Sequence, residues 1–252
     1  MSPYKKVRDL VADLVRRVGF MLLRTTSEHR AFTDIFTPPY CTNVDWRSGV
    51  GDAVFVLYGL VRAQRPQVVV EIGSARGRSS CALALACRTN GKGRVFAIDP
   101  HDVNPWTESE TGGSTEAFLR ARLQDYHLNE WCEVMAMTSV EAAKTWTRKI
   151  DLLFIDGDHS FDGVRSDFEM FRSWLAPNAL VAFHDTAWNH YSLPEGQAQS
   201  EDLRGKLATM GVPRFMEALK HEGYRSITLP LAPGLTILDP SVEGFVFCPP
   251  ES

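Results

Sequence analysis

The fold of this chain is decided by the stretch Val68-Val-Val-Glu-Ile-Gly-Ser-Ala-Arg-Gly-Arg-Ser79. Its first residues are apolar and β-branched, a pattern that predicts a short buried strand. Gly73 and Gly77 then bracket a turn, and the small residues from Ser79 to Ala86 predict a helix that packs closely on a sheet. A strand, a glycine turn and a helix in this order present backbone N–H groups to a ligand at the carboxyl edge of a doubly wound sheet.

Details of the turn indicate which ligand it takes. The dinucleotide fingerprint needs a glycine where this chain has Ala75. Glu71 places a carboxylate beside the turn, which would repel a pyrophosphate and suits an ammonium group. A second predicted strand, residues 94–99, ends in Asp99, an acid that can accept both hydroxyls of a ribose. Ammonium and ribose together describe S-adenosylmethionine; the alternative is a generic βαβ unit whose acids are solvated strand ends.

Composition narrows the class of protein. The 252 residues, 44% hydrophobic and 23% charged, predict one globular α/β domain with additions. A net charge of −4 gives no reason to expect binding to nucleic acid, which requires a basic face on the protein. Five scattered cysteines without a C-x-x-C pair predict free thiols in a reducing cytoplasm. No apolar run approaches the roughly 18 residues of a membrane span, and charged residues interrupt any signal-peptide core near the N-terminus.

Predicted strands alternate with predicted helices along the chain. The strands are predicted at 68–70, 94–99, 132–137, 150–156, 179–184, 224–229 and 234–238, with a turn at 175–178. This order predicts a doubly wound, mostly parallel seven-stranded sheet, closed by an antiparallel edge hairpin around Pro230 and Pro233. Ligand sites of such sheets lie at the carboxyl ends of the strands. We therefore expect Glu71, Asp99, Ser139, Asp156 and His184 to meet at one rim.

The remaining segments extend this domain, which we expect to span residues 49–252. Residues 1–48 are predicted to form an N-terminal helix and a cap segment. An apolar face within 5–24 is expected to pack on this domain or on a second copy in a homo-oligomer, with a membrane surface as the alternative. The irregular segments near 101–113 and 186–212 are too polar and too long for routine connections, so we expect them to be lid or binding loops.

A second group of polar residues follows the fourth and fifth predicted strands. Asp156-Gly-Asp158-His159 comes after one, and His184-Asp185-Thr186 ends the other. A divalent cation is an economical way to hold several acids and an imidazole together. The alternative is an Asp-Gly turn beside a pair of acids satisfied by backbone N–H groups. The chain has no HExxH, G-x-S-x-G or P-loop motif.

Four motifs in order resemble class I S-adenosylmethionine-dependent O-methyltransferases. They are E-I-G-S-x-x-G-x-S at 71–79, A-I-D-P at 97–100, F-I-D-G-D-H at 154–159 and F-H-D-T at 183–186. The likeness covers about residues 49–190. It is nearest to the bacterial branch that methylates sugars and natural products, including macrolide and aminocoumarin tailoring enzymes. Catechol and caffeoyl-CoA O-methyltransferases are more distant relatives.

The resemblance implies a role for each matching position. Glu71 and Gly73 match the turn that binds the donor's ammonium, and Asp99 matches the acid that binds the ribose. Ser79 matches a carboxylate contact, and Ser139 a contact beside the adenine. The cofactor-binding residues implied in this way are Gly51, Glu71, Gly73, Ser74, Gly77, Ser79, Asp99, Ser139 and Asp156.

The resemblance also implies a magnesium site, formed here by Asp156, His184 and Asp185. An imidazole is a poorer magnesium ligand than a carboxylate, so the ion is Mg²⁺ or another divalent cation, or Asp158 replaces His184. Catechol-type enzymes carry a lysine where this chain has His159, which leaves His159 or a metal-bound carboxylate, Asp156, as the catalytic base.

Methyl transfer needs a hydroxyl oxygen in line with the sulfonium methyl group and loss of the hydroxyl proton. A cation that polarises two neighbouring oxygens predicts a small-molecule acceptor with vicinal hydroxyls, either a sugar diol or a catechol. Two other functions stay open at this point. One is a binding protein without transferase activity, and the other is a different reaction on the same fold, as in a cephalosporin-tailoring branch.

Overall fold

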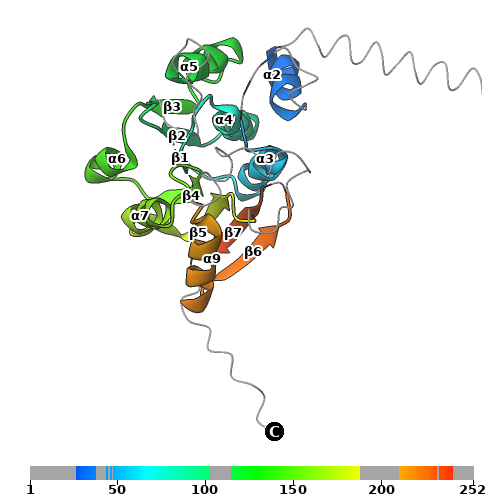
Figure 1. Cartoon of the computed structure of the whole chain (residues 1–252). Coiled ribbons are helices and arrows are strands. Elements are labelled where there is room, and N and C mark those ends of the chain that lie inside the picture. Colours follow the sequence, from blue (N-terminus) through cyan, green and yellow to red (C-terminus); the bar gives the residue numbers. More distant parts are fainter. Residues whose placement is uncertain are drawn as a thin grey trace, which may run out of the picture.

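The structure, a computed structural model, describes residues 27–37, 44, 46, 48–102, 115–187, 210–231 and 233–240. One sheet of seven strands runs through the domain in the order β3-β2-β1-β4-β5-β7-β6, with helices on both of its faces (Figure 1). The strands are β1 Val68–Ile72, β2 Arg94–Ile98, β3 Cys132–Met135, β4 Ile150–Ile155, β5 Leu175–His184, β6 Arg225–Leu229 and β7 Leu235–Asp239. The helices are α2 Ser27–Phe36, α3 Ala53–Gln64, α4 Arg78–Asn90, α5 Thr115–Asp125, α6 Ser139–Thr145, α7 Phe161–Arg172 and α9 Val212–His221.

The predicted sheet topology is confirmed. β1 pairs in parallel with both β2 and β4, and β3 and β5 extend the parallel part on either side. β7 then pairs antiparallel with both β5 and β6, which makes the predicted edge hairpin. The molecule therefore has the α/β Rossmann-like arrangement, in which the carboxyl ends of β1, β2, β4 and β5 share one edge.

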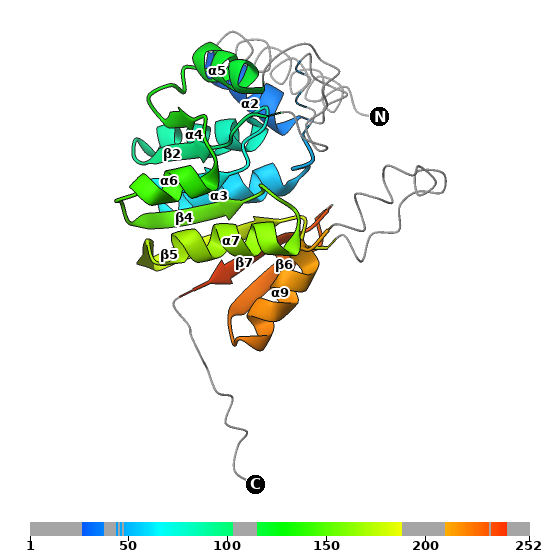
Figure 2. The same ribbon diagram turned by 60° about the vertical axis from the view of Figure 1, so that its left-hand side comes forward.

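Two apolar cores lie on opposite faces of this sheet. Val69 belongs to the core beneath α2, α3, α4 and α5, whereas the next residue, Val70, belongs to the core beneath α6, α7 and α9. Figure 2 shows these two helical layers on either side of the strands. Burial on both faces explains why the strand residues form continuous apolar runs and do not alternate with polar residues.

The fifth strand begins earlier than predicted. Residues 175–178, which include Pro177, were expected to form a turn, yet β5 starts at Leu175. The pairing Ile150↔Leu175 is followed directly by Leu152↔Leu180, so the strand is irregular between these two pairs. A proline is tolerated in such an irregular stretch because its missing N–H would not have served the regular ladder.

Helix α2 is an addition that the sequence analysis did not specify within residues 1–48. Ala31 and Ile35 lie in the same apolar core as α3 and α4. The Arg78 guanidinium at the start of α4 donates to the Ile35 carbonyl at 2.9 Å, and Trp46 Nε1 donates to the Asp34 carbonyl at 2.8 Å. Side-chain donors thus tie this helix to the main domain. The predicted helix at 5–24 lies outside the described residues, as do most of the two expected loop segments.

Helices of the described part of the chain are too short, or too polar, to cross a membrane.

Candidate functional site

A cavity of about 640 Å³ opens at the carboxyl edge of the sheet, a size that suits a small-molecule ligand. Its walls come from the turns after β1 and β2, the start of α6, the loop after β4 and one side of α7. Predicted site residues that line it are Gly73, Ser74, Ser79, Asp99, Ser139, Asp156 and His159. These residues are distant in sequence, and the parallel strands bring them to one place, as expected from the topology.

The turn after β1 depends on a glycine at position 73. Gly73 has a φ of +87°, and a Cβ on it would lie 2.1 Å from the Asp156 carbonyl oxygen. Gly73 N–H donates to the Ile98 carbonyl at 2.9 Å, and Asp156 N–H donates to the Ile72 carbonyl at 2.8 Å. The three strand ends are therefore held together by backbone contacts that leave no room for a side chain.

Glu71 lies beneath the cavity and not in its wall. Its side chain is wholly buried, and the Ser80 hydroxyl donates a hydrogen bond to one carboxyl oxygen. Burial raises the pKa of Glu71 to about 8, although hydrogen bonds from Ser79 and Ser80 oppose the shift. Glu71 therefore lies behind the cavity wall, where its carboxyl supports the first turn of α4. Its expected contact with a ligand ammonium stays a prediction.

This burial predicts a pH-dependent stability. The folded carboxyl keeps its proton up to about pH 8, whereas an exposed one loses it near pH 4.5. The contribution of the protonated Glu71 to the free energy of unfolding is therefore complete below about pH 4.5. It falls by up to about 1.4 kcal/mol per pH unit as the pH rises, and it is lost above about pH 8. Glu71→Gln should remove this slope, as measured by urea unfolding between about pH 5 and pH 8. The exposed Glu169→Gln should keep it, and an equal slope in both variants would contradict the assignment.

Two more predicted cofactor residues lie outside the cavity wall. Gly77 begins α4 with a φ of +83°, and a Cβ on it would lie 2.1 Å from Leu119 Cδ1, so close packing against α5 requires this glycine. Gly51 does not line the cavity, whereas Ser48 and Gly49 do. The structure thus places this segment, but not Gly51 itself, at the cavity wall.

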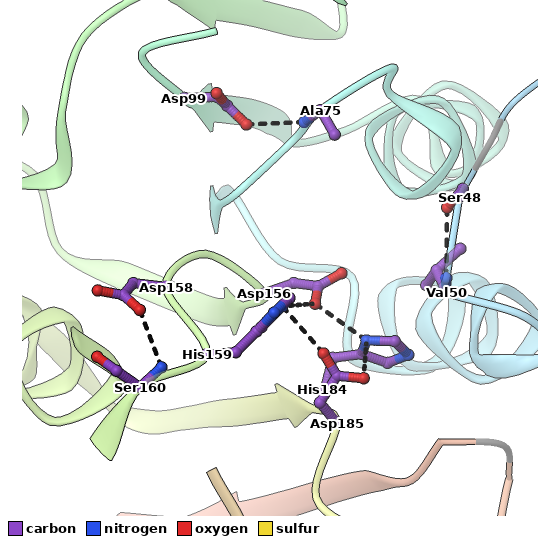
Figure 3. A network of polar contacts seen from close by, with 10 residues as sticks. All are labelled: Ser48, Val50, Ala75, Asp99, Asp156, Asp158, His159, Ser160, His184 and Asp185. Atoms are coloured by element: carbon purple, nitrogen blue, oxygen red, sulfur yellow. Dashed lines mark hydrogen bonds and ion pairs between the residues drawn. The ribbon is translucent and has the colours of Figure 1, made fainter. Parts of the chain in front are cut away.

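Asp99 is held firmly at the end of β2. One carboxylate oxygen accepts from Ala75 N–H at 2.8 Å (Figure 3), and the other accepts from His101 N–H at 2.6 Å. Each oxygen retains a second lone pair, and the side chain lines the cavity. Asp99 is thus oriented to accept hydrogen bonds from a pair of hydroxyl groups.

Four side chains after β4 and β5 form what we call the acid–imidazole cluster: Asp156, His159, His184 and Asp185 (Figure 3). His159 Nε2 lies 2.9 Å from Asp185 Oδ2 and 3.6 Å from Asp156 Oδ1. His184 Nδ1 lies 2.9 Å from Asp156 Oδ1 and 3.4 Å from Asp185 Oδ1. Asp185 has a φ of +60°, a conformation that costs a non-glycine residue energy and that often accompanies functional sites.

The charges of this cluster compensate one another. Burial by itself lowers the pKa of a histidine, because it disfavours the charged imidazole. Here the hydrogen bonds to Asp156 and Asp185, together with their negative charges, outweigh burial. The pKa of both His159 and His184 is therefore raised to about 10. Although burial opposes it, hydrogen bonds from the two imidazoles lower the pKa of Asp185 below its ordinary value. Without an ion, the cluster therefore holds two carboxylates against two imidazolium groups.

The same side chains fit a divalent cation by their chemistry. Among the described residues, Asp156, His184 and Asp185 form a group whose ligand atoms all lie within 4.8 Å of one another. His184 Nδ1 is the ring nitrogen that faces both carboxylates. The buried Nε2 has no hydrogen-bond partner in the part of the chain that the structure describes. The alternative ligand Asp158 lies outside this group, and its carboxylate accepts from Ser160 N–H at 2.9 Å at the start of α7. Two carboxylates and one imidazole suit a transition-metal ion at least as well as Mg²⁺.

The sequence analysis did not identify Asp167 as a site residue. Asp167 lies in the middle of α7, is 5% exposed, and lines the cavity. Motif spacing drew attention to strand ends, whereas this acid reaches the site from a helix. A single acid on the apolar face of α7, between Val164 and Phe168, was the available signal.

Comparisons with known proteins agree with this fold. A family model described as a methyltransferase domain matches residues 70–186. The chain is also 30% identical to the uncharacterised protein y4gI of Sinorhizobium fredii over 130 residues, which are 50% of this chain. This match spans only 14% of the length of that curated relative.

Two solved structures are similar to most of this chain. The S-adenosylhomocysteine-bound methyltransferase PaMTH1 of Podospora anserina has a TM-score of 0.64 at 14% identity, over 90% of this chain and 95% of that one. The second is TomG of Streptomyces achromogenes, an O-methyltransferase of tomaymycin synthesis solved in complex with S-adenosylmethionine. It has a TM-score of 0.57 at 17% identity, over 85% of this chain and 90% of that one. At these identities the similarity shows a shared fold alone, the α/β Rossmann-like fold described above.

Proposed function

We propose that this chain, whose residues 70–186 match the methyltransferase domain family, transfers a methyl group from S-adenosylmethionine to a hydroxyl oxygen of a small molecule. One observation carries the proposal: a single cavity is lined both by Asp99 and the Gly73 turn and by Asp156 and His159. A donor held at the first pair would therefore reach an acceptor held at the second without leaving the cavity.

Donor binding relies on groups that are oriented before the ligand arrives. Asp99 offers its carboxylate to the two ribose hydroxyls, while Ser74 and Ser79 line the wall beside the glycine turn. Orientation by backbone hydrogen bonds reduces the entropy lost on binding. A fixed donor is what an in-line transfer requires, because misplacing the reacting atoms by about 1 Å costs about 10²-fold in rate.

Proton removal from the acceptor is assigned to His159. Its imidazole lines the cavity, and Asp185 and Asp156 hold Nε2 from the other side. A divalent cation, when bound, would supply Lewis-acid polarisation of the acceptor oxygens, and Asp156, His184 and Asp185 are the residues that would hold it. His159 acts as a base only in its neutral form, and the two aspartate charges favour its charged form. Compensation of these charges is therefore a condition for catalysis.

The acceptor in this proposal carries two neighbouring hydroxyl groups. A sugar or natural-product diol is our first choice, because the sequence motifs are most similar to the bacterial tailoring branch. A catechol is the second, since a more acidic phenol needs less help from the base. We also propose that the active protein is a homo-oligomer and that it acts in the cytoplasm. Sedimentation equilibrium of the purified chain measures the number of subunits.

The donor assignment is tested by titration calorimetry. S-adenosylhomocysteine should bind to the wild type more tightly than NAD. Asp99→Asn should weaken this binding by about 10-fold or more, the worth of a charged hydrogen bond. The exposed Asp162→Asn serves as the matched control and should bind like the wild type. Tighter binding of NAD, or no binding of S-adenosylhomocysteine at all, would refute the proposed function.

A further inference from the structure

One buried acid of the cavity has no part in the proposed reaction. The Asp167 side chain projects from α7, is 5% exposed, and lines the same cavity as Asp99. Its Oδ2 lies 3.2 Å from the place that a Cβ on Gly157 would occupy. The carboxylate is therefore pressed against the loop after β4, where a larger residue at 157 would crowd it.

This carboxylate has more acceptor capacity than the protein around it uses. Buried carboxylates are normally satisfied by several hydrogen bonds. Within the described residues, the partner of Asp167 is the Ser139 side chain. Burial raises the pKa of Asp167 to about 6. The Ser139 hydrogen bond opposes this shift, and the negative charge of Asp158 adds a smaller increase. A further N–H donor arriving through the cavity would relieve this unfavourable burial.

The surroundings of Asp167 suit a flat heterocycle. Val140 follows Ser139 at the start of α6, lines the cavity and leaves 46% of its side chain exposed, which is unusual for a large apolar residue here. Gly163 and Ser166 add small residues from α7 to the same wall. An apolar surface beside a buried acceptor fits a ring that has one apolar face and an N–H donor on its edge.

We propose that Asp167 determines the base specificity of this site by accepting a hydrogen bond from the exocyclic 6-amino group of the donor's adenine. This inference rests on the proposed function, because it assumes an adenosyl donor with its ribose at Asp99. Purines with a 6-oxo group would place a carbonyl oxygen against the carboxylate, and two acceptors repel. Asp167 thus acts by rejecting deaminated nucleosides as well as by binding adenine.

The proposal is tested by calorimetry with two ligands, S-adenosylhomocysteine and its deaminated analogue S-inosylhomocysteine. The wild type should prefer the 6-amino ligand by about 10- to 150-fold, the range for a hydrogen bond to a charged group. Asp167→Asn should reduce this preference by at least about tenfold, because an amide N–H can donate to the 6-oxo oxygen. Part of the change should be a gain in affinity for S-inosylhomocysteine, which a misfolded variant cannot show.

Two matched variants complete the experiment. Asp162→Asn, an exposed change on the same helix, should keep the wild-type preference. Asp158→Asn removes the other nearby acid of the cavity wall and should also keep most of it. An unchanged preference in Asp167→Asn, or its loss in Asp158→Asn instead, would overturn the proposal. If the wild type binds neither ligand, the proposed function fails and not the role of Asp167 alone.

Discussion

Replacing His159 by Gln should lower turnover by about 10²–10⁴-fold, the loss typical of a missing general base. The imidazole lines the cavity, and its Nε2 lies 2.9 Å from Asp185 Oδ2. A Gln amide can still donate to Asp185 but cannot take the acceptor's proton. Affinity for S-adenosylhomocysteine should change little, because His159 acts on the acceptor and not on the donor.

The measurement is single-turnover transfer of a radiolabelled methyl group. It uses the most active acceptor from a panel of catechols and sugar diols, with calorimetry of S-adenosylhomocysteine binding in parallel. His221→Gln, an exposed change on α9, is the matched control and should transfer at the wild-type rate. A His159→Gln variant with full turnover would remove this residue from the mechanism.

Replacing Asp185 by Asn should cut turnover by roughly 10²-fold or more, because the cluster would lose a ligand of the proposed cation. Both oxygens of Asp185 face imidazole nitrogens, at 2.9 Å from His159 and 3.4 Å from His184. Removing its charge also leaves two buried imidazoles with one carboxylate, so thermal unfolding must show that the variant is folded at the assay temperature. Donor affinity should stay close to that of the wild type.

Chelation separates the role of a metal from the role of Asp185 itself. Treatment of the wild-type protein with a chelator should reproduce the Asp185→Asn defect, and added Mg²⁺ or Mn²⁺ should reverse it. The exposed Asp162→Asn variant should respond to chelator as the wild type does. Turnover that is indifferent to chelation would refute metal assistance. His159 would then be the sole base, and an acidic phenol would replace a sugar diol as the preferred acceptor.

Backbone architecture could be predicted from the sequence because it depends on local patterns. β-Branched apolar runs alternate with helices, and this alternation permits few arrangements other than a doubly wound sheet. The same pattern predicted that Asp99, Ser139 and Asp156 would meet, since parallel strands bring their carboxyl ends to one edge. Gly73 was recognised from the glycine turn, and the structure adds that a Cβ at this position would meet the Asp156 carbonyl oxygen.

Side-chain roles were decided by tertiary packing. Glu71 ends a strand just as Asp99 does, yet α4 covers it completely and leaves Asp99 at the cavity. Residue type and spacing are alike in the two cases, so only the depth of burial separates a neutral structural carboxyl from a ligand-facing one. Pro177 likewise suggested a turn, but pairing with β4 on both sides of an irregular stretch kept it within β5.

The sequence by itself thus determined the sheet, its order of elements and the edge at which the site lies. Tertiary structure decided which acids line the cavity, that His159 lies against Asp156 and Asp185, and that Asp167 reaches the cavity from the middle of a helix. The physical reason is one of range. Hydrophobic periodicity acts over a few residues, whereas burial and charge at a site depend on segments that are far apart in the chain.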